Sequence, residues 1–353
     1  MADPTSPTVN VLTTINQYLS SAWVDQVLRS NFFFGEVLSN TEQWKGSQML
    51  FQMKYQKGVS TVAFNGFDVL PTNQLPVSVN MTFYPTFTAT NVALAGSDIP
   101  VNQSPMQVLD LIKITMKSRA QDGADDVGNF FQSNGQAFGG KAPAGLGNIV
   151  DNGAVSSTYG GLSRATYAGL NATVTNSSGT ISLLKVRQLS NTITDDLIAP
   201  TMALTEYNVW SYFEQLLQPF QRNTYSDEFR RMKAGAGYEG NNTIGGVGLI
   251  WDGLTIYRDK KVTAGNFYLL NLDFLKFHGL NWWQGSKVGM MDKQIEGNIY
   301  SYMNPASSSK AFTWSGFIDA YNMGAVNGFM IMGGQLICTD PFRNGLLYGI
   351  TGI

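Results

Sequence analysis

The stretch Met49–Phe83, MLFQMKYQKGVSTVAFNGFDVLPTNQLPVSVNMTF, begins and ends with the alternation of a β-hairpin. Apolar residues recur at every second position in both arms: Met49, Phe51, Met53 and Tyr55 in the first, Val77, Val79, Met81 and Phe83 in the second. About twenty residues separate the arms, whereas most hairpin loops have two to five. The pattern therefore predicts a long two-stranded ribbon.

The insert between the two arms is partly apolar, with Phe64, Phe67, Val69 and Leu70 near its middle. An isolated two-stranded ribbon is at best marginally stable in water, and it has no core in which to bury such side chains. We therefore expect these four residues, at the tip of the ribbon, to contact an adjacent subunit.

Residues 1–40 are expected to form an N-terminal arm. The segment MADPTSPT is small, polar and rich in proline, and one or two short helices are predicted after it. The three consecutive phenylalanines Phe32, Phe33 and Phe34 need cover. They could pack on their own subunit or on a neighbour, and as part of the arm we expect them to make contacts between subunits.

The strongest helix signal lies at residues 104–132. Ser104 is a good N-cap and Pro105 occupies the first helical position, where a missing N–H costs nothing. An apolar stripe follows at steps of three and four: Leu109, Ile112, Met116, Ala120, Ala124, Val127 and Phe131. The helix would be ~42 Å long, and Asn134-Gly135 is expected to end it.

After the ribbon, Phe83–Ala95 is expected to continue as a strand that ends at Gly96. The rest of the chain reads mainly as short β-segments. Residues 135–192 are rich in Gly, Ser, Thr and Asn, and a helical region broken at Pro200 follows, with Thr194 or Asp195 expected to cap its start. Residues 244–257 read as strand, turn and strand, and the β-pattern returns after about residue 285.

Composition argues against several classes of protein. The chain has 353 residues, of which 43% are hydrophobic and only 14% charged, and its net charge is −2. No basic stripe suggests dedicated nucleic-acid binding. One cysteine, Cys338, excludes an internal disulfide. No signal peptide or membrane span is evident, so we expect folding in a reducing cytoplasm.

No catalytic, cofactor or metal site is expected. The one histidine, His278, lies beside apolar residues near a predicted turn and is expected to be a structural or a surface residue rather than a catalytic one. The adjacent carboxylate pairs, such as Asp125-Asp126, would point in different directions on a helix and make poor catalytic dyads. The glycine-rich stretches lack the spacing of a phosphate loop, and no zinc motif is present.

The order of these parts resembles the major capsid protein of tailed bacteriophages, which has the Hong Kong 97-type fold. Three later stretches also look familiar: TYGGLSRATYAGLNA (158–172), WDGLTIYRDKKVTAGNFYLLNLDFLKF (251–277) and NWWQGSKVGMM (281–291). The resemblance implies an α+β fold with these parts: an N-arm (1–40), an extended loop and its base (41–83), a peripheral domain with a spine helix (84–135, helix 104–132), an axial domain (136–283), and peripheral return strands with the C-terminus (284–353).

The resemblance also implies a function without enzymatic activity. The chain would assemble into pentamers and hexamers of an icosahedral shell around double-stranded DNA, within a virion assembled in the host cytoplasm. Its partners would be copies of itself, a separate scaffolding protein, a portal protein, a possible decoration protein, and packaged DNA held by weak non-specific contact; no membrane is involved.

Three alternatives remain open from the sequence. An encapsulin-like compartment uses the same fold to hold cargo enzymes. A tail-tube or other virion protein would share the composition but should lack the long helix. A β-rich carbohydrate-active enzyme would need two carboxylates brought together in a cleft.

Overall fold

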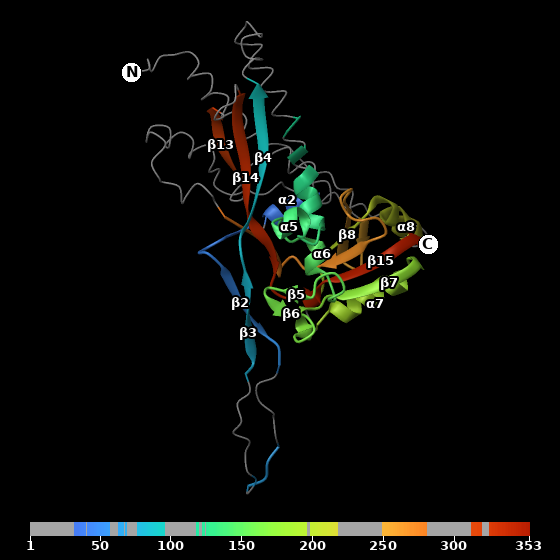
Figure 1. Cartoon of the computed structure of the whole chain (residues 1–353). Coiled ribbons are helices and arrows are strands. Elements are labelled where there is room, and N and C mark those ends of the chain that lie inside the picture. The colour runs from blue at the N-terminus through green and yellow to red at the C-terminus, as the bar shows by residue number, and fades with distance from the viewer. Residues whose placement is uncertain are drawn as a thin grey trace.

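The computed structural model describes residues 32–39, 41–56, 63–66, 68, 76–95, 118–119, 122–123, 125–195, 198–217, 249–280, 312–319 and 325–353. Its strands form a five-stranded sheet, a six-stranded sheet and two two-stranded pairs, with helices packed around them. The result is an elongated α+β molecule in which one strand pair projects well away from the body (Figure 1).

The projecting pair is the predicted ribbon. Strand β2 (Met49–Lys54) runs antiparallel to β3 (Ser78–Phe83), from the pair Met49–Phe83 to the pair Lys54–Ser78. The face predicted to be apolar is the one turned to the body: Met81 and Phe83 are buried, whereas Leu50, of the opposite parity, is 56% exposed. The hairpin and its register are therefore confirmed.

The five-stranded sheet is built around one long strand, β14 (Ala325–Cys338). Its other strands are β1 (Glu42–Gln43), β4 (Thr86–Ala95), β12 (Leu275–Gly279) and β13 (Phe312–Asp319). The sequence suggested that the strand after the ribbon runs unbroken from Phe83 to Ala95. Instead the chain leaves the ribbon at Tyr84-Pro85, and β4 pairs with β14. Pro85 lacks an N–H, so it cannot donate to a continuous ladder.

The six-stranded sheet lies at the right of the molecule in Figure 1. Its strands in spatial order are β7 (Thr173–Thr180), β15 (Gly345–Gly352), β11 (Phe267–Leu270), β8 (Met202–Thr205), β10 (Leu254–Arg258) and β9 (Leu249–Trp251). Two helices pack on this sheet, α7 (Leu183–Ile193) and α8 (Tyr207–Leu217). Their apolar side chains and those of the sheet form a second core cluster.

Helix α7 begins before the helical region suggested by the sequence. The Ser182 hydroxyl accepts from the Lys185 N–H at 3.3 Å and caps the start of α7. Thr194 is the C-cap of this helix, so the expectation that it caps the start of a helix is wrong. A helix that is capped at Asp195 and runs to Pro200 is not found either, because Asp195 forms a β-bridge with Ile198 and β8 follows before α8.

Two crossings of the chain join the two large sheets. The chain passes from β11 to β12 and again from β14 through η4 (Pro341–Arg343) to β15. The crossings lie side by side, because the Asn271 N–H donates to Asn344 Oδ1 at 3.0 Å and both side chains are buried. These crossings assign β12 to the five-stranded sheet and β15 to the six-stranded sheet.

That assignment differs from the expected segments. The segment 284–353, expected to hold the peripheral return strands and the C-terminus, contributes β13 and β14 to the five-stranded sheet and β15 to the six-stranded sheet, between β7 and β11. Similarly, β12 falls within 136–283 but belongs to the five-stranded sheet. The order of strands in space depends on long-range pairing, which apolar alternation does not encode.

The long helix is described only over its C-terminal part. The described residues between 118 and 132 are helical, and the helix ends at Gln132, close to the predicted stop. Gly135 then adopts φ +79°, a conformation that suits glycine. The predicted start at Ser104 lies outside the described residues.

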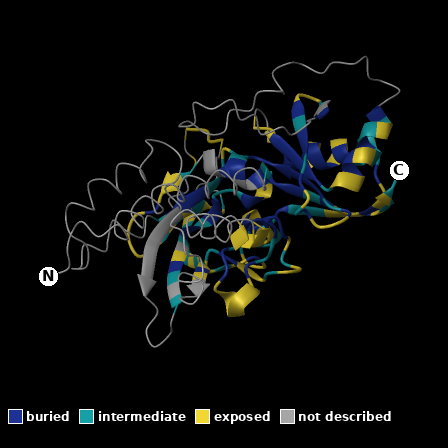
Figure 2. Ribbon diagram, turned by 90° about the horizontal axis from the view of Figure 1, so that it is seen from above, coloured by how far each residue is buried: buried dark blue, intermediate teal, exposed yellow. Residues whose placement is uncertain are grey.

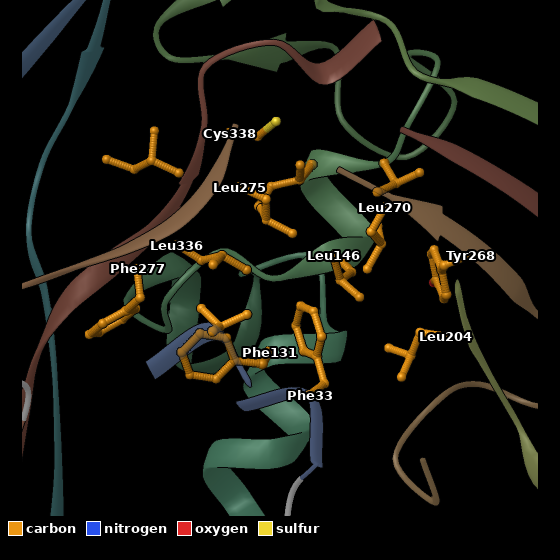
Figure 3. Packing of buried hydrophobic residues seen from close by; sticks show 14 of the residues in the cluster. Phe33, Phe131, Leu146, Leu204, Tyr268, Leu270, Leu275, Phe277, Leu336 and Cys338 are labelled. Carbon is orange, nitrogen blue, oxygen red and sulfur yellow. The ribbon is translucent and has the colours of Figure 1, made fainter. Parts of the chain in front are cut away.

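Short elements connect this helix to the six-stranded sheet, and α2 (Phe32–Ser39) precedes the ribbon. The connecting elements are α5 (Ala137–Gly140), α6 (Leu146–Ile149), β5 (Thr158–Tyr159), β6 (Leu162–Ser163) and η1 (Ala168–Leu170). Figure 3 shows how Phe33 of α2 and Phe131 of the long helix point into one apolar cluster with Leu146 and Leu336. Buried residues extend from this cluster across the six-stranded sheet (Figure 2).

Candidate assembly interface

The described residues offer no site for metal or membrane chemistry. No group of three or more His, Cys, Asp and Glu side chains among them is placed to hold a metal ion. None of the described helices is both long and apolar enough to cross a membrane. The candidate functional feature is the projecting ribbon, whose contacts with the body begin at its base.

The base of the ribbon rests on the turn between β5 and β6. The Thr82 N–H donates to the Gly160 carbonyl at 2.8 Å, and the rings of Phe83 and Tyr159 meet edge to face with centroids 5.3 Å apart. Gly160 has φ +56°, and a Cβ there would lie 2.8 Å from Met81 Cβ. Only glycine permits this close approach, which fixes the angle at which the ribbon leaves the body.

The outer half of the ribbon is held by fewer contacts. Tyr55 meets Tyr167 edge to face at 5.2 Å, and the Tyr55 N–H donates to the Val77 carbonyl at 3.1 Å. The Gln56 side-chain amide donates to the Pro76 carbonyl at 2.5 Å. Beyond this point the described part of the ribbon lies well away from the body (Figure 1).

The tip of the ribbon exposes an aromatic ring. Phe64 is 63% exposed, next to a turn in which the Asp68 N–H donates to the Asn65 carbonyl and the Asn65 N–H donates to Asp68 Oδ2, both at 2.8 Å. The other predicted tip residues, Phe67, Val69 and Leu70, lie outside the described residues. An ordered turn that presents an exposed phenylalanine is suited to contact a second molecule.

The phenylalanines of the arm lie differently from those of the ribbon tip. Phe33 is 1% exposed in the chain's own core, and Phe32 stacks on Tyr257 with ring centroids 4.3 Å apart. For these two rings the structure therefore favours packing on the same subunit. The structure does not describe the side chain of Phe34, and the contact of Phe34 with a neighbouring subunit stays a prediction.

A buried arginine, which the sequence analysis did not single out, organises the loop under the ribbon. Arg164 donates to the carbonyls of Asp151 at 2.8 Å, Asn148 at 2.5 Å and Leu170. Its guanidinium lies 5.1 Å from the centre of the Tyr159 ring, the ring that supports Phe83. Burial lowers the pKa of Arg164. Arg164 thus connects three turns of the loop to the ribbon base.

One sequence signal could have identified Arg164. The Gly/Ser-rich stretch from 135 to 180 contains only three charged residues, Lys141, Asp151 and Arg164. Two of these are buried, and the Asp151 carboxylate accepts from the Ser156 N–H at 2.8 Å. An isolated charge in a neutral polar loop indicates a partner nearby, because an unpaired buried charge is costly.

The chain's one histidine, His278, lies beneath the ribbon. It is 2% exposed on β12, its ring is 5.5 Å from that of Phe51, and its Nδ1 lies 3.8 Å from Glu42 Oε2 on β1. Lys276 Nζ contacts the other Glu42 oxygen at 2.6 Å. Burial, together with the charge of Lys276, lowers the pKa of His278, although Glu42 acts in the opposite direction. Of the two roles expected for His278, structural or surface, this position fits the structural one.

We expect the stability of the chain to fall as the pH is lowered through about 6.5. The unfolded chain binds a proton at His278 more readily than the folded chain does, because the folded pKa is lowered, so protonation favours unfolding. Urea unfolding between about pH 7.5 and 5.5 measures this slope. Since the chain has one histidine, His278→Gln should flatten it, and an unchanged slope in this variant would contradict the assignment.

No protein-family model and no curated protein sequence matches this chain. Solved structures do match. The capsid asymmetric unit of cyanophage A-1(L) superposes with a TM-score of 0.66 at 13% identity, covering 91% of this chain and 93% of that one. The chain has a bacteriophage capsid fold.

Two other solved structures extend this capsid-fold likeness. The capsid of the native GTA particle has a TM-score of 0.52 at 10% identity, covering 89% of each chain. The holo-SrpI encapsulin from Synechococcus elongatus has a TM-score of 0.50 at 9% identity, covering 88% of this chain and 85% of that one. The resemblance predicted from the order of segments is thus confirmed for the fold, which phage capsid proteins share with an encapsulin.

Proposed function

We propose that this chain is a structural capsid protein that assembles with copies of itself into a closed shell. The observation that carries the proposal is the ribbon: in a capsid fold, an ordered projection ends in a phenylalanine that its own chain leaves 63% exposed. Phe64, together with Phe67, Val69 and Leu70, would be covered by the adjacent subunit. Burial of apolar surface stabilises a contact by about 25 cal/mol per Å². Burial of the ribbon tip, once per subunit, would therefore stabilise the assembly.

The ribbon contact is heterologous, because each subunit would reach one neighbour and be reached by another. Such an interface closes into rings when the rotation between subunits permits it. We propose rings of five and six, joined into an icosahedral shell that encloses double-stranded DNA. Assembly would involve a separate scaffolding protein and a portal protein in the host cytoplasm, and a decoration protein could bind the finished shell.

The two large sheets would belong to different domains of the shell subunit. The six-stranded sheet with α7 and α8 would form the axial domain, whose loops meet at the ring centre. The five-stranded sheet and the long helix would form the peripheral domain, and residues before the ribbon the N-arm. The low charge of the chain, −2 in 353 residues, would let many copies pack closely without strong repulsion.

An encapsulin-like compartment is the second candidate, favoured by the likeness to the SrpI structure. Both candidates predict a shell, and they differ in content. Co-purified DNA of defined length would favour the capsid, whereas a co-purified enzyme would favour the compartment. Neither function requires catalysis by this chain.

We expect the purified chain to form rings or closed shells as its concentration is raised. Sedimentation velocity measures the size of the species, and negative-stain electron microscopy shows their shape. Assembly should protect the ribbon tip from proteolysis, because the neighbour covers it. A chain that stays monomeric at every concentration, with its ribbon folded against its own body, would contradict the proposal.

A further inference from the structure

Arg258, the last residue of β10, is held by two aromatic rings of α8. Its guanidinium carbon lies 4.7 Å from the centre of the Trp210 ring and 5.1 Å from that of Tyr207. Trp210 is buried, whereas Tyr207 is 47% exposed and Arg258 half-buried, so the group reaches the surface of the six-stranded sheet unit. Cation–π contacts on two rings restrict the arginine to one position.

Arg258 also differs from the other arginines in the described part of the chain. The others donate to oxygen atoms: Arg119 to Asp122, Arg164 to three carbonyls, Arg187 to Asp252, and Arg343 to Asp195 and Asp340. Within the described residues, Arg258 has no such oxygen partner. Among the described residues, the charge of Arg258 therefore faces aromatic rings and no carboxylate.

Asp259 follows Arg258 in the chain and Glu206 follows its strand partner Thr205, and the carboxylates of both are used elsewhere. Both oxygens of Glu206 accept within the chain, from Asn208 Nδ2 at 2.7 Å and from the Gly265 N–H at 3.1 Å. Both oxygens of Asp259 also accept backbone groups, the Lys261 N–H at 2.9 Å and the Phe33 N–H at 3.3 Å. The fold thus places acids close to Arg258 and commits them to other donors.

A stacked guanidinium keeps its N–H donors available at the edge. The fork of donors matches the two oxygens of a carboxylate, and such bidentate pairs are stronger than neutral hydrogen bonds. Because the rings already fix the side chain, little conformational entropy is lost when an acid binds. Arg, Trp and Tyr are also the residues most enriched among those that dominate protein interfaces.

We propose that Arg258, positioned by Tyr207 and Trp210, binds a surface carboxylate of a second copy of this chain. The inference rests on the proposed function, because in a ring of identical chains each contact joins two different faces of the same protein. The chain carries 25 acidic residues against 23 basic ones, so an identical neighbour supplies acids for such a contact. This contact is separate from the ribbon, which projects from the body well away from α8 (Figure 1).

The test compares Arg258→Met with a matched control, Arg187→Met. Arg187 also lies on an aromatic ring, 4.9 Å from the centre of Trp251, but its guanidinium is already paired with Asp252 of the same chain. We expect Arg258→Met to raise the protein concentration needed for association about tenfold, as loss of a central interface arginine does. Arg187→Met should change that concentration less than about twofold, because its donors are used within the chain.

Further measurements separate the possible outcomes. The salt dependence of association should be weaker in Arg258→Met than in the wild type, since a charge pair has been removed. If Arg258→Met does not fold, Arg258→Lys keeps the charge but loses the fork, and it should weaken association by a smaller factor. Wild-type association in Arg258→Met, or in a folded Arg258→Lys when Met fails, would overturn the inference while leaving the proposed function intact.

Measuring the binding of DNA provides a third test. A variant that associates normally but binds a DNA duplex more weakly would assign Arg258 to phosphate and overturn the contact between copies. If the wild-type chain itself does not associate at any concentration, the proposed function and this inference fail together. Failure of Arg258→Met alone therefore remains distinguishable from failure of the shell.

Discussion

A chain in which the dipeptide Asn-Gly replaces residues 57–75 should fold normally and fail to assemble. The replacement removes the outer ribbon with Phe64, Phe67, Val69 and Leu70. It keeps β2, β3 and every described contact of the ribbon base with the body. The expected result is a monomer at concentrations where the wild type forms rings or shells, because the reach to the neighbour is lost.

The geometry of the ribbon permits this shortening. The Tyr55 N–H is hydrogen-bonded to the Val77 carbonyl, and the Gln56 side chain donates to the Pro76 carbonyl. The two strands are therefore close together at the point where the insert begins and ends. Asn-Gly is the preferred pair for a two-residue hairpin turn, whose twist matches that of the strands. The unfolding midpoint of the shortened chain should therefore stay close to that of the unassembled wild type.

A pair of point variants tests the same contact more finely. Phe64→Ser removes the exposed ring and should weaken assembly, whereas Phe64→Leu keeps an apolar side chain and should weaken it less. Neither change should affect the stability of the monomer, since Phe64 is exposed in the single chain. Assembly of the shortened chain into normal shells, seen by electron microscopy, would refute the role of the ribbon.

Replacing Arg164 by Met should destabilise the chain by about 3 kcal/mol or more. The substitution keeps much of the side-chain volume but leaves the carbonyls of Asn148, Asp151 and Leu170 without their donor in a buried site. Tyr159 would also lose the cation above its ring, and Tyr159 supports Phe83 at the ribbon base. We expect the loss both in the free energy of unfolding and in the order of the ribbon base.

Chemical denaturation of the unassembled chain measures the first effect, and hydrogen exchange of the Thr82 amide measures the second. Arg164→Lys is the control: it keeps the charge but reaches fewer carbonyls, so its loss should be intermediate. A stability of Arg164→Met within about 0.5 kcal/mol of the wild type, the range of ordinary surface substitutions, would show that the carbonyls find other donors.

Local pattern was enough for the elements that depend on neighbouring residues. The parity of Met49–Tyr55 and Val77–Phe83 predicted which face of the ribbon is buried, because side chains alternate across a strand. The Asn134-Gly135 pair marked the end of the long helix to within two residues. Pattern failed at Thr194, where the same residue type can begin or end a helix, and at Pro85, where an alternating run contained a break.

The sequence by itself determined the ribbon, the end of the long helix and the order of parts that resembles a capsid protein. Only the tertiary structure decided that β15 lies between β7 and β11, that Phe33 is buried in its own subunit, and that Arg164 and Arg258 have different surroundings. The physical reason is distance along the chain: alternation and capping depend on nearby residues, whereas strand order, burial and charge pairing depend on contacts between residues far apart in sequence.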